Sequence, residues 1–259
     1  MAKLPQRFLD IDAALLPYGG TGATLADILA AINAGNTLAG MWLTYKSSEF
    51  VTVRPGSVSI AGAAVVLDAP VDVSIYDDFG DAGSPLSNTI YYLYAANENG
   101  TLVFYFSASA PVTQHSESVT AQPQYRYTAL QHPQHELWRY IGQVLYCTNA
   151  TLLPFTVCTP TYWEGAWVSA TRNVDMTLEH AWGAVPQDVG FMFSTTTTNS
   201  TNVLTTLTYA ALATKRYGVL PRVISNKTIG LDVQKDALFW DNNTASWVNS
   251  GYIKAIVRR

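Results

Sequence analysis

Residues 89–109 read TIYYLYAANENGTLVFYFSAS, and this stretch decides which fold class we expect. On both sides of Asn99-Gly100, aromatic and β-branched residues alternate with smaller or more polar ones. A period of two is typical of a half-buried β-strand. The Asn-Gly pair favours a tight turn because both positions tolerate positive φ. The stretch therefore predicts an antiparallel β-hairpin.

Strand-like segments continue on both sides of this hairpin. Residues 41–45 (MWLTY), 57–67 (SVSIAGAAVVL), 71–76 (VDVSIY) and 137–147 (LWRYIGQVLYC) are rich in β-branched and aromatic residues. A second series of such segments runs over residues 161–259, with turn signals between them and no helical period. This pattern predicts an all-β protein built from antiparallel β-sandwich domains, two in number.

We expect three regions along the chain. Residues 1–40 form an N-terminal segment for attachment or oligomerisation, which contains a short helix. Residues 41–155 form a first β-sandwich, and residues 160–259 form a second, C-terminal β-sandwich. The boundary between the two sandwiches falls near residues 150–160.

The N-terminal segment contains the run LPYGGTGATLADILAAINAG, residues 16–35. Thr24 can cap a helix over residues 25–34, and Gly35 can end it. The apolar residues of this helix recur at i, i+3, i+4 and i+7 and so share one face: Leu25, Ile28, Leu29 and Ile32. About ten residues make a marginal helix alone, so we expect this oligomerisation face to pack on other copies of the chain.

The glycines in this run do not complete a phosphate-binding loop. A Walker pattern needs a lysine after its glycines, and no lysine follows Gly22. The dinucleotide pattern needs a third glycine where Leu25 stands. A turn that leads into the short helix is the favoured interpretation.

Composition argues against several classes of function. Charged residues make up only 13% of the 259 residues, and apolar residues make up 48%. A net charge of −4 without a basic stripe argues against nucleic-acid binding. No run reaches the about 18 apolar residues of a membrane span, and MAKLPQRFLDID has no apolar signal core, so we expect neither a membrane span nor a secretory signal. Cys147 and Cys158 are therefore expected to be buried free thiols.

No motif in the sequence points to a catalytic centre or a metal site. Asp77, Asp78 and Asp81 form an acidic loop that lacks EF-hand spacing. His132 and His135 have a proline between them, which spoils the helical geometry of a shared metal site. A Gly-x-Ser-x-Gly elbow is absent. We therefore expect no catalytic residue, no metal and no cofactor.

Aromatic residues are the remaining signal. Tyr162, Trp163 and Trp167 cluster in TYWEGAW, where Pro160 and Gly165 favour a loop. Exposed Trp and Tyr rings can stack on sugar rings, so these three residues are the candidate receptor or glycan contacts. The alternative is that the same rings belong to a sandwich core or a subunit interface.

Several segments resemble proteins of one family. LPYGGTGAT resembles a GGTGAT-type segment of tailed-bacteriophage tail-fibre proteins, and the Tyr-rich hairpin followed by LWRYIGQVLY is similar to the β-domain of phage receptor-binding proteins. LEHAWGAVPQDV (residues 178–189) and WVNSGYIKAIVRR (residues 247–259) resemble segments of tail-fibre terminal sandwiches. The sequence departs from long fibres because it has no shaft of repeats.

The resemblance implies a virion protein of a phage tail, assembled in the host cytoplasm as a homotrimer. It implies a short tail fibre or receptor-binding protein that docks on other virion proteins through its N-terminal segment and binds host surface polysaccharide. The low charge and abundant Tyr, Trp and Thr suit subunit interfaces.

Two alternatives stay open from the residues. The chain is a structural head fibre, adaptor or baseplate component without receptor binding, or it is a small polysaccharide depolymerase. A depolymerase needs two carboxylates about 5–10 Å apart in a groove. Glu136, Glu164 and Glu179 are available, but the sequence alone does not pair them. We expect a protein that is not an enzyme.

Overall fold

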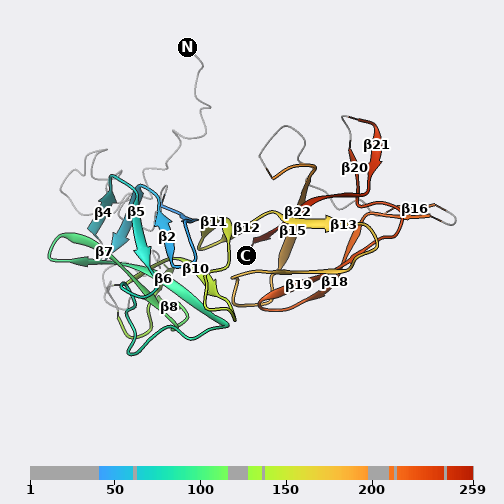
Figure 1. Ribbon diagram of the computed structural model, residues 1–259. Helices are drawn as coiled ribbons and strands as arrows, with labels where there is room; N and C mark the ends of the chain where they lie inside the picture. Colours follow the sequence, from blue (N-terminus) through green and yellow to red (C-terminus); the bar gives the residue numbers. More distant parts are fainter. Residues whose placement is uncertain are drawn as a thin grey trace, which may run out of the picture.

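Figure 1 shows the computed structural model of the chain, whose described residues form β-strands joined by turns and loops. The structure describes residues 41–60, 63–115, 128–135, 138–197, 210–212, 215–241 and 244–258. No helix occurs in these ranges, and the strands within each sheet pair antiparallel. The expected all-β class with packed antiparallel sheets is confirmed. The predicted helix with Leu25, Ile28, Leu29 and Ile32 lies outside the described residues.

The largest sheet has eight strands and crosses most of the molecule (Figure 1). Its strands, in spatial order, are β13 (Val168–Thr171), β22 (Ser250–Arg258), β12 (Tyr162–Gly165), β11 (Phe155–Thr159), β1 (Leu43–Tyr45), β2 (Phe50–Val53) and β5 (Val71–Ser74), with β15 (Asp188–Ser194) also paired to β22.

Smaller sheets pack against this one. A five-stranded sheet has the order β7 (Thr101–Ser107), β6 (Thr89–Glu98), β10 (Arg139–Tyr146), β9 (Thr128–Gln131) and β8 (Val112–His115). A three-stranded sheet has the order β14 (Met176–Glu179), β19 (Thr228–Val233) and β18 (Val219–Ile224). Three hairpins complete the described fold: β3 (Gly56–Ile60) with β4 (Ala63–Leu67), β16 (Ala210–Leu212) with β17 (Lys215–Tyr217), and β20 (Phe239–Asp241) with β21 (Ser246–Val248).

The hairpin expected from the opening stretch is present as β6 and β7. Glu98 pairs with Thr101, so Asn99 and Gly100 form a two-residue turn. Their φ angles are 53° and 88°, which is the left-handed conformation that such hairpin turns require. The Asn-Gly turn that the sequence predicts is therefore the turn that connects β6 and β7 in the observed register.

The eight-stranded and five-stranded sheets meet face to face where β1 and β2 of the first sheet lie against β6 and β10 of the second. Leu43 and Val51 from the first sheet and Leu93 and Ile141 from the second are fully buried in one hydrophobic core. Gly142 lies at the closest approach, because a Cβ atom built there would be only 2.6 Å from Leu43 Cδ1. A glycine is therefore needed at this point of the sheet-to-sheet contact.

Strand β22 pairs on both of its edges with strands from residues 160–259. Residues 256–258 pair with β12, residues 250–253 pair with β13, and the opposite edge pairs with β15. The eight-stranded sheet nevertheless takes strands from both expected sandwich ranges, because β11 pairs with β1 and with β12, and β11 lies at the expected boundary near residues 150–160. The division into two sandwich domains stays a prediction.

Candidate functional site

The eight-stranded sheet has two chemically different faces. Leu43 pairs with Cys158, Cys158 pairs with Trp163, and Trp163 pairs with Val257. Directly paired residues share a face, and all four of these side chains are buried. They form the inner face, which lies on the core. Alternate residues along each strand point to the opposite side, which we call the outer face.

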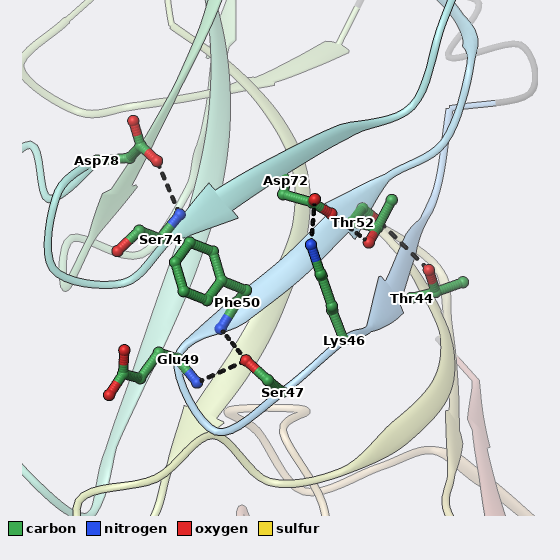
Figure 2. Close-up of polar contacts among 9 residues, drawn as sticks. All are labelled: Thr44, Lys46, Ser47, Glu49, Phe50, Thr52, Asp72, Ser74 and Asp78. Atoms are coloured by element: carbon green, nitrogen blue, oxygen red, sulfur yellow. Dashed lines mark hydrogen bonds and ion pairs between the residues drawn. The ribbon is translucent and has the colours of Figure 1, made fainter.

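Most side chains on the outer face are polar or aromatic and are exposed or half-buried, although Lys254, Ile256 and Ser74 are buried there. Figure 2 shows the part of it near β1, β2 and β5, where Lys46, Thr52 and Asp72 point toward one another. Thr52 Oγ1 donates to Asp72 Oδ1 at 2.7 Å, and the Lys46 ammonium pairs with the same carboxylate. The hydrogen bond from Lys46 lowers the pKa of Asp72 below its ordinary value. The charges of Lys46 and Asp72 at this end of the outer face are therefore paired.

Strand β12 divides the predicted contact residues between the two faces. Residues 162–167 were expected in a loop, but Tyr162–Gly165 form a strand, and side chains alternate along a strand. Tyr162 therefore lies on the outer face, whereas Trp163 lies on the inner face and is 1% exposed. A ring this buried has no side open to a ligand, so we withdraw Trp163 as a contact residue. For Tyr162 and Trp167 the expectation stays a prediction.

Trp163 is a core residue with a specific packing environment. Its ring meets the edge of the His180 ring at a centroid distance of 6.2 Å. Gly165 makes room for it, because a Cβ there would be 2.8 Å from Trp163 Cη2. Its indole Nε1 has no hydrogen-bond partner among the described residues. The alternative weighed for this residue, a ring in the sandwich core, is the one that the structure supports.

Tyr162, Glu164, Trp167 and Lys254 form a connected cluster on the outer face. The Tyr162 hydroxyl donates to Glu164 Oε2 at 2.6 Å, and Glu164 Oε1 accepts from the Lys254 ammonium. Lys254 is 2% exposed, and its Nζ lies 4.4 Å from the centroid of the half-buried Trp167 ring. Burial, and then the hydrogen bond to Glu164, raises the pKa of Tyr162. The tryptophan thus covers a buried cation–carboxylate pair.

The contacts of Glu164 in this cluster hold neighbouring side chains in place, and they are not those of an acid–base pair. Both carboxylate oxygens of Glu164 are engaged, one by a cation and one by a phenol. A glycosidase pair would place a second carboxyl group across from it. A second charged pair, Arg258 with Asp188, is exposed, and Arg258 lies 6.0 Å from the Tyr162 ring centroid.

A Ser-His-Asp trio lies elsewhere, on the five-stranded sheet, and the sequence did not reveal it. Ser107 Oγ donates to Asp81 Oδ1 at 2.7 Å and lies 3.0 Å from His132 Nε2. His132 Nδ1 accepts from the Gln134 N–H at 3.1 Å, so Nε2 carries the proton and donates to Ser107. A nucleophilic serine needs the opposite direction, with the imidazole accepting its proton. The trio therefore fixes a loop and does not activate Ser107.

Aromatic rings gather beside this trio. Tyr105 and Trp138 stack at a centroid distance of 4.6 Å, and Trp138 stacks on His135 at 4.1 Å. His132 meets the same indole edge-on at 5.1 Å. Burial, and then the neighbouring His135, lowers the pKa of His132. His132 and His135 are thus engaged in ring packing.

The remaining polar candidates have structural contacts. Asp78 Oδ2 accepts from the Ser74 N–H at 2.7 Å, which closes a turn after β5 (Figure 2). Over the described ranges, no group of three or more His, Cys, Asp or Glu side chains could hold a metal ion. Cys147 and Cys158 are both free thiols. Cys158 is buried as expected, whereas Cys147 is only half-buried, so the expected burial is wrong for Cys147.

No protein-family model matches the chain, and no curated protein matches it. In the part of the chain that the structure describes, no helix is long and apolar enough to cross a membrane.

Proposed function

We propose that this chain is a structural protein of a tailed-bacteriophage virion, a short tail fibre or receptor-binding protein that attaches the particle to the host cell surface. One structural observation carries the proposal. Half-buried aromatic rings and polar side chains share the outer face of a sheet that spans eight strands. The proposal is supported by the resemblance to tail-fibre proteins of the β6–β7 hairpin, of residues 178–189 and of the closing strand.

Host surface polysaccharide is the proposed receptor. Tyr162 and Trp167 are its proposed contact residues, because both rings are half-buried on or beside the outer face. Stacking of such rings on sugars gives weak single sites, and several copies per particle would multiply the attachment. Homotrimerisation and docking on other virion proteins belong to the N-terminal segment in this proposal.

The proposed role is binding and not catalysis. Glu164 has no partner acid among its described contacts, and the hydrogen-bond direction at Ser107 is the reverse of nucleophile activation. These observations favour attachment over a depolymerase.

The proposal is tested with the purified full chain in two measurements. Light scattering on a gel-filtration column is expected to give a mass near three times the chain mass of 28.2 kDa. An array of purified bacterial surface polysaccharides is expected to show saturable binding to at least one polysaccharide, without release of reducing ends. A folded monomer that binds no polysaccharide would contradict both parts of the proposal, and cleavage of a bound polysaccharide would favour the depolymerase instead.

A further inference from the structure

Strand register places a row of side chains across the outer face. Tyr162 pairs with Thr159 on one side and with Arg258 on the other, and Arg258 pairs with Asp188. Leu43 pairs with Cys158, so the preceding residue, Trp42, lies opposite Thr159. The Arg54 N–H donates to the Trp42 carbonyl at 2.8 Å, which continues the row onto the next strand. We call this set the Trp42 row: Arg54, Trp42, Thr159, Tyr162, Arg258 and Asp188.

Trp42 stands out by its exposure. All seven tryptophans of the sequence lie in described residues, and Trp42, at 36%, is the one with an exposed side chain. Its neighbours Met41 and Leu43 are buried, so the strand directs the indole to the outer face. An indole buries a large apolar area when it is covered, which makes an exposed one a candidate binding residue.

Trp42 and Tyr162 are separated by one intervening strand. Neighbouring strands lie about 4.8 Å apart, so the two rings stand about 10 Å apart across the sheet. The strand between them contributes the small, half-buried Thr159 side chain, which leaves no bulky group between the rings. This geometry suits an extended ligand that lies across the strands and covers both rings.

We propose that a linear polysaccharide binds along the Trp42 row, with two of its sugar rings, separated by one intervening sugar, stacked on Trp42 and Tyr162. The inference rests on the proposed function and specifies where the receptor binds and in which direction it runs. Tyr162 is oriented before binding, because Glu164 accepts a hydrogen bond from its hydroxyl. Trp42 adds a second stacking position, one that sequence patterning did not reveal.

The polar members of the row match sugar hydroxyl groups. Arg258 and Asp188 form an exposed pair at 3.2 Å, with side chains 52% and 58% exposed. Such a pair offers both donors and acceptors, as an uncharged sugar with several hydroxyls requires. A nucleic acid does not fit, because phosphate binding needs an excess of positive charge and this chain has a net charge of −4. The row therefore favours a neutral or weakly charged glycan chain.

The test uses the full chain and the polysaccharide that it binds on the array of purified bacterial surface polysaccharides. That polysaccharide is cut into fragments of graded length, and Kd is measured for each fragment. Trp42→Ala is expected to weaken binding of long fragments about tenfold and to leave the already weak binding of the shortest fragments unchanged. Trp42→Phe, which keeps a ring, is expected to restore most of the affinity.

Tyr76→Ala serves as the matched control. Tyr76 is an aromatic residue that is 45% exposed and lies outside the row, where its hydroxyl contacts that of Tyr146. This variant is expected to bind long fragments like the wild type. Circular dichroism and the midpoint of thermal unfolding verify that each variant is folded.

The outcomes separate the two proposals. If the wild-type chain binds no polysaccharide, the proposed function is wrong and the inference falls with it. If the wild-type chain binds but folded Trp42→Ala binds equally well, or if affinity does not rise with fragment length, the inference is wrong and the proposed function stands. A loss confined to long fragments that Trp42→Phe restores supports the row.

Discussion

At the scale of single residues, the most consequential group is the buried ammonium of Lys254. It is 2% exposed, and its charge is balanced by Glu164, which is 15% exposed. Removing a charge from water costs several kcal/mol unless a partner and hydrogen bonds compensate for it. Glu164 provides the partner, and the Trp167 ring provides a favourable face for the cation.

Glu164→Gln is therefore expected to lower the free energy of unfolding by about 3 kcal/mol, because it leaves Lys254 buried and unpaired. Urea denaturation measures the change. Adding Lys254→Met to this variant is expected to recover most of the loss, since no buried charge remains. Asp188→Asn removes the exposed pair with Arg258 and is the matched control, with an expected loss below about 1 kcal/mol. An unchanged stability of Glu164→Gln would show that the pair is not coupled to folding.

His180 supplies a pH-dependent contribution to stability. Its ring is fully buried; Nε2 lies 3.1 Å from the Ser225 carbonyl, and Nδ1 accepts from the Trp182 N–H at 3.1 Å. Nε2 must therefore carry the proton, so the neutral imidazole is fully satisfied. Burial lowers the pKa of His180 from 6.5 to about 4, and the contact with Ser225 opposes this only in part.

Because the folded pKa of His180 is depressed, its contribution to stability is present above pH 6.5 and is lost as the pH falls from 6.5 toward 4. In that window the unfolded state binds a proton that the folded state does not. We expect this group to remove up to about 3 kcal/mol from the free energy of unfolding. Urea denaturation at pH 7, 5.5 and 4 measures the free energy of unfolding at each pH. The difference between the wild type and His180→Gln in the slope of this free energy against pH gives the contribution of His180. Equal slopes for the two proteins would contradict the assignment.

At the scale of elements, the Gly142 position on β10 decides how closely two sheets approach. A Cβ there would lie 2.6 Å from Leu43 Cδ1 and 3.4 Å from Cys158 Sγ. The contact joins two strands of the eight-stranded sheet to the centre of the five-stranded one. Overpacking of this kind forces side chains or backbone to shift.

Gly142→Ala is expected to destabilise the fold by about 1–3 kcal/mol in thermal or urea denaturation. Combining it with Leu43→Ala is expected to cost less than the sum of the two single changes, since the smaller side chain leaves room for the new methyl group. Gly190→Ala on β15 is the matched control, because its Cβ would meet Ile256 at an ordinary 3.8 Å. Strictly additive effects at Gly142 and Leu43 would contradict the close approach.

The β6–β7 hairpin and β12 show where local sequence is enough to predict a strand and where it is not. In the β6–β7 hairpin, alternation and Asn99-Gly100 predict both strands and the turn, because strand period and positive φ are local properties. In TYWEGAW, Pro160 and Gly165 suggest a loop, yet Tyr162–Gly165 form a strand. That strand exists because β11 and β22 pair with its two edges, and β22 lies far away in the sequence.

At the scale of the whole molecule, β11 joins the two expected sandwich ranges in one sheet, because it pairs with β1 on one edge and with β12 on the other. Cys158 on β11 is fully buried and pairs with Leu43 on one side and with Trp163 on the other. A buried hydrogen bond also crosses between the two ranges, from Gln143 Nε2 to the Trp182 carbonyl at 3.0 Å. These contacts couple the folding of the ranges that the sequence assigns to separate sandwiches.

We therefore expect the described β-structure to unfold in a single cooperative transition in scanning calorimetry. Val257→Ala is expected to lower the midpoint of that transition and to destabilise the chain by about 2 kcal/mol without splitting it. Two well-separated transitions, with Val257→Ala affecting one of them, would show that residues 41–155 and 160–259 are independent domains.

The sequence by itself determined the fold class, the main hairpin and its turn, because periods of two and positive-φ turn residues act over a few neighbouring positions. It also selected a segment, Tyr162 to Trp167, whose residues divide between the core and the outer face. Only the tertiary structure decided that Trp163 is buried, that Glu164 meets Lys254 across 90 residues of chain, and that Trp42 and Tyr162 lie in one row. These facts depend on which strands become neighbours and in which register, and that choice is made by the packing of the whole sheet and not by any single segment.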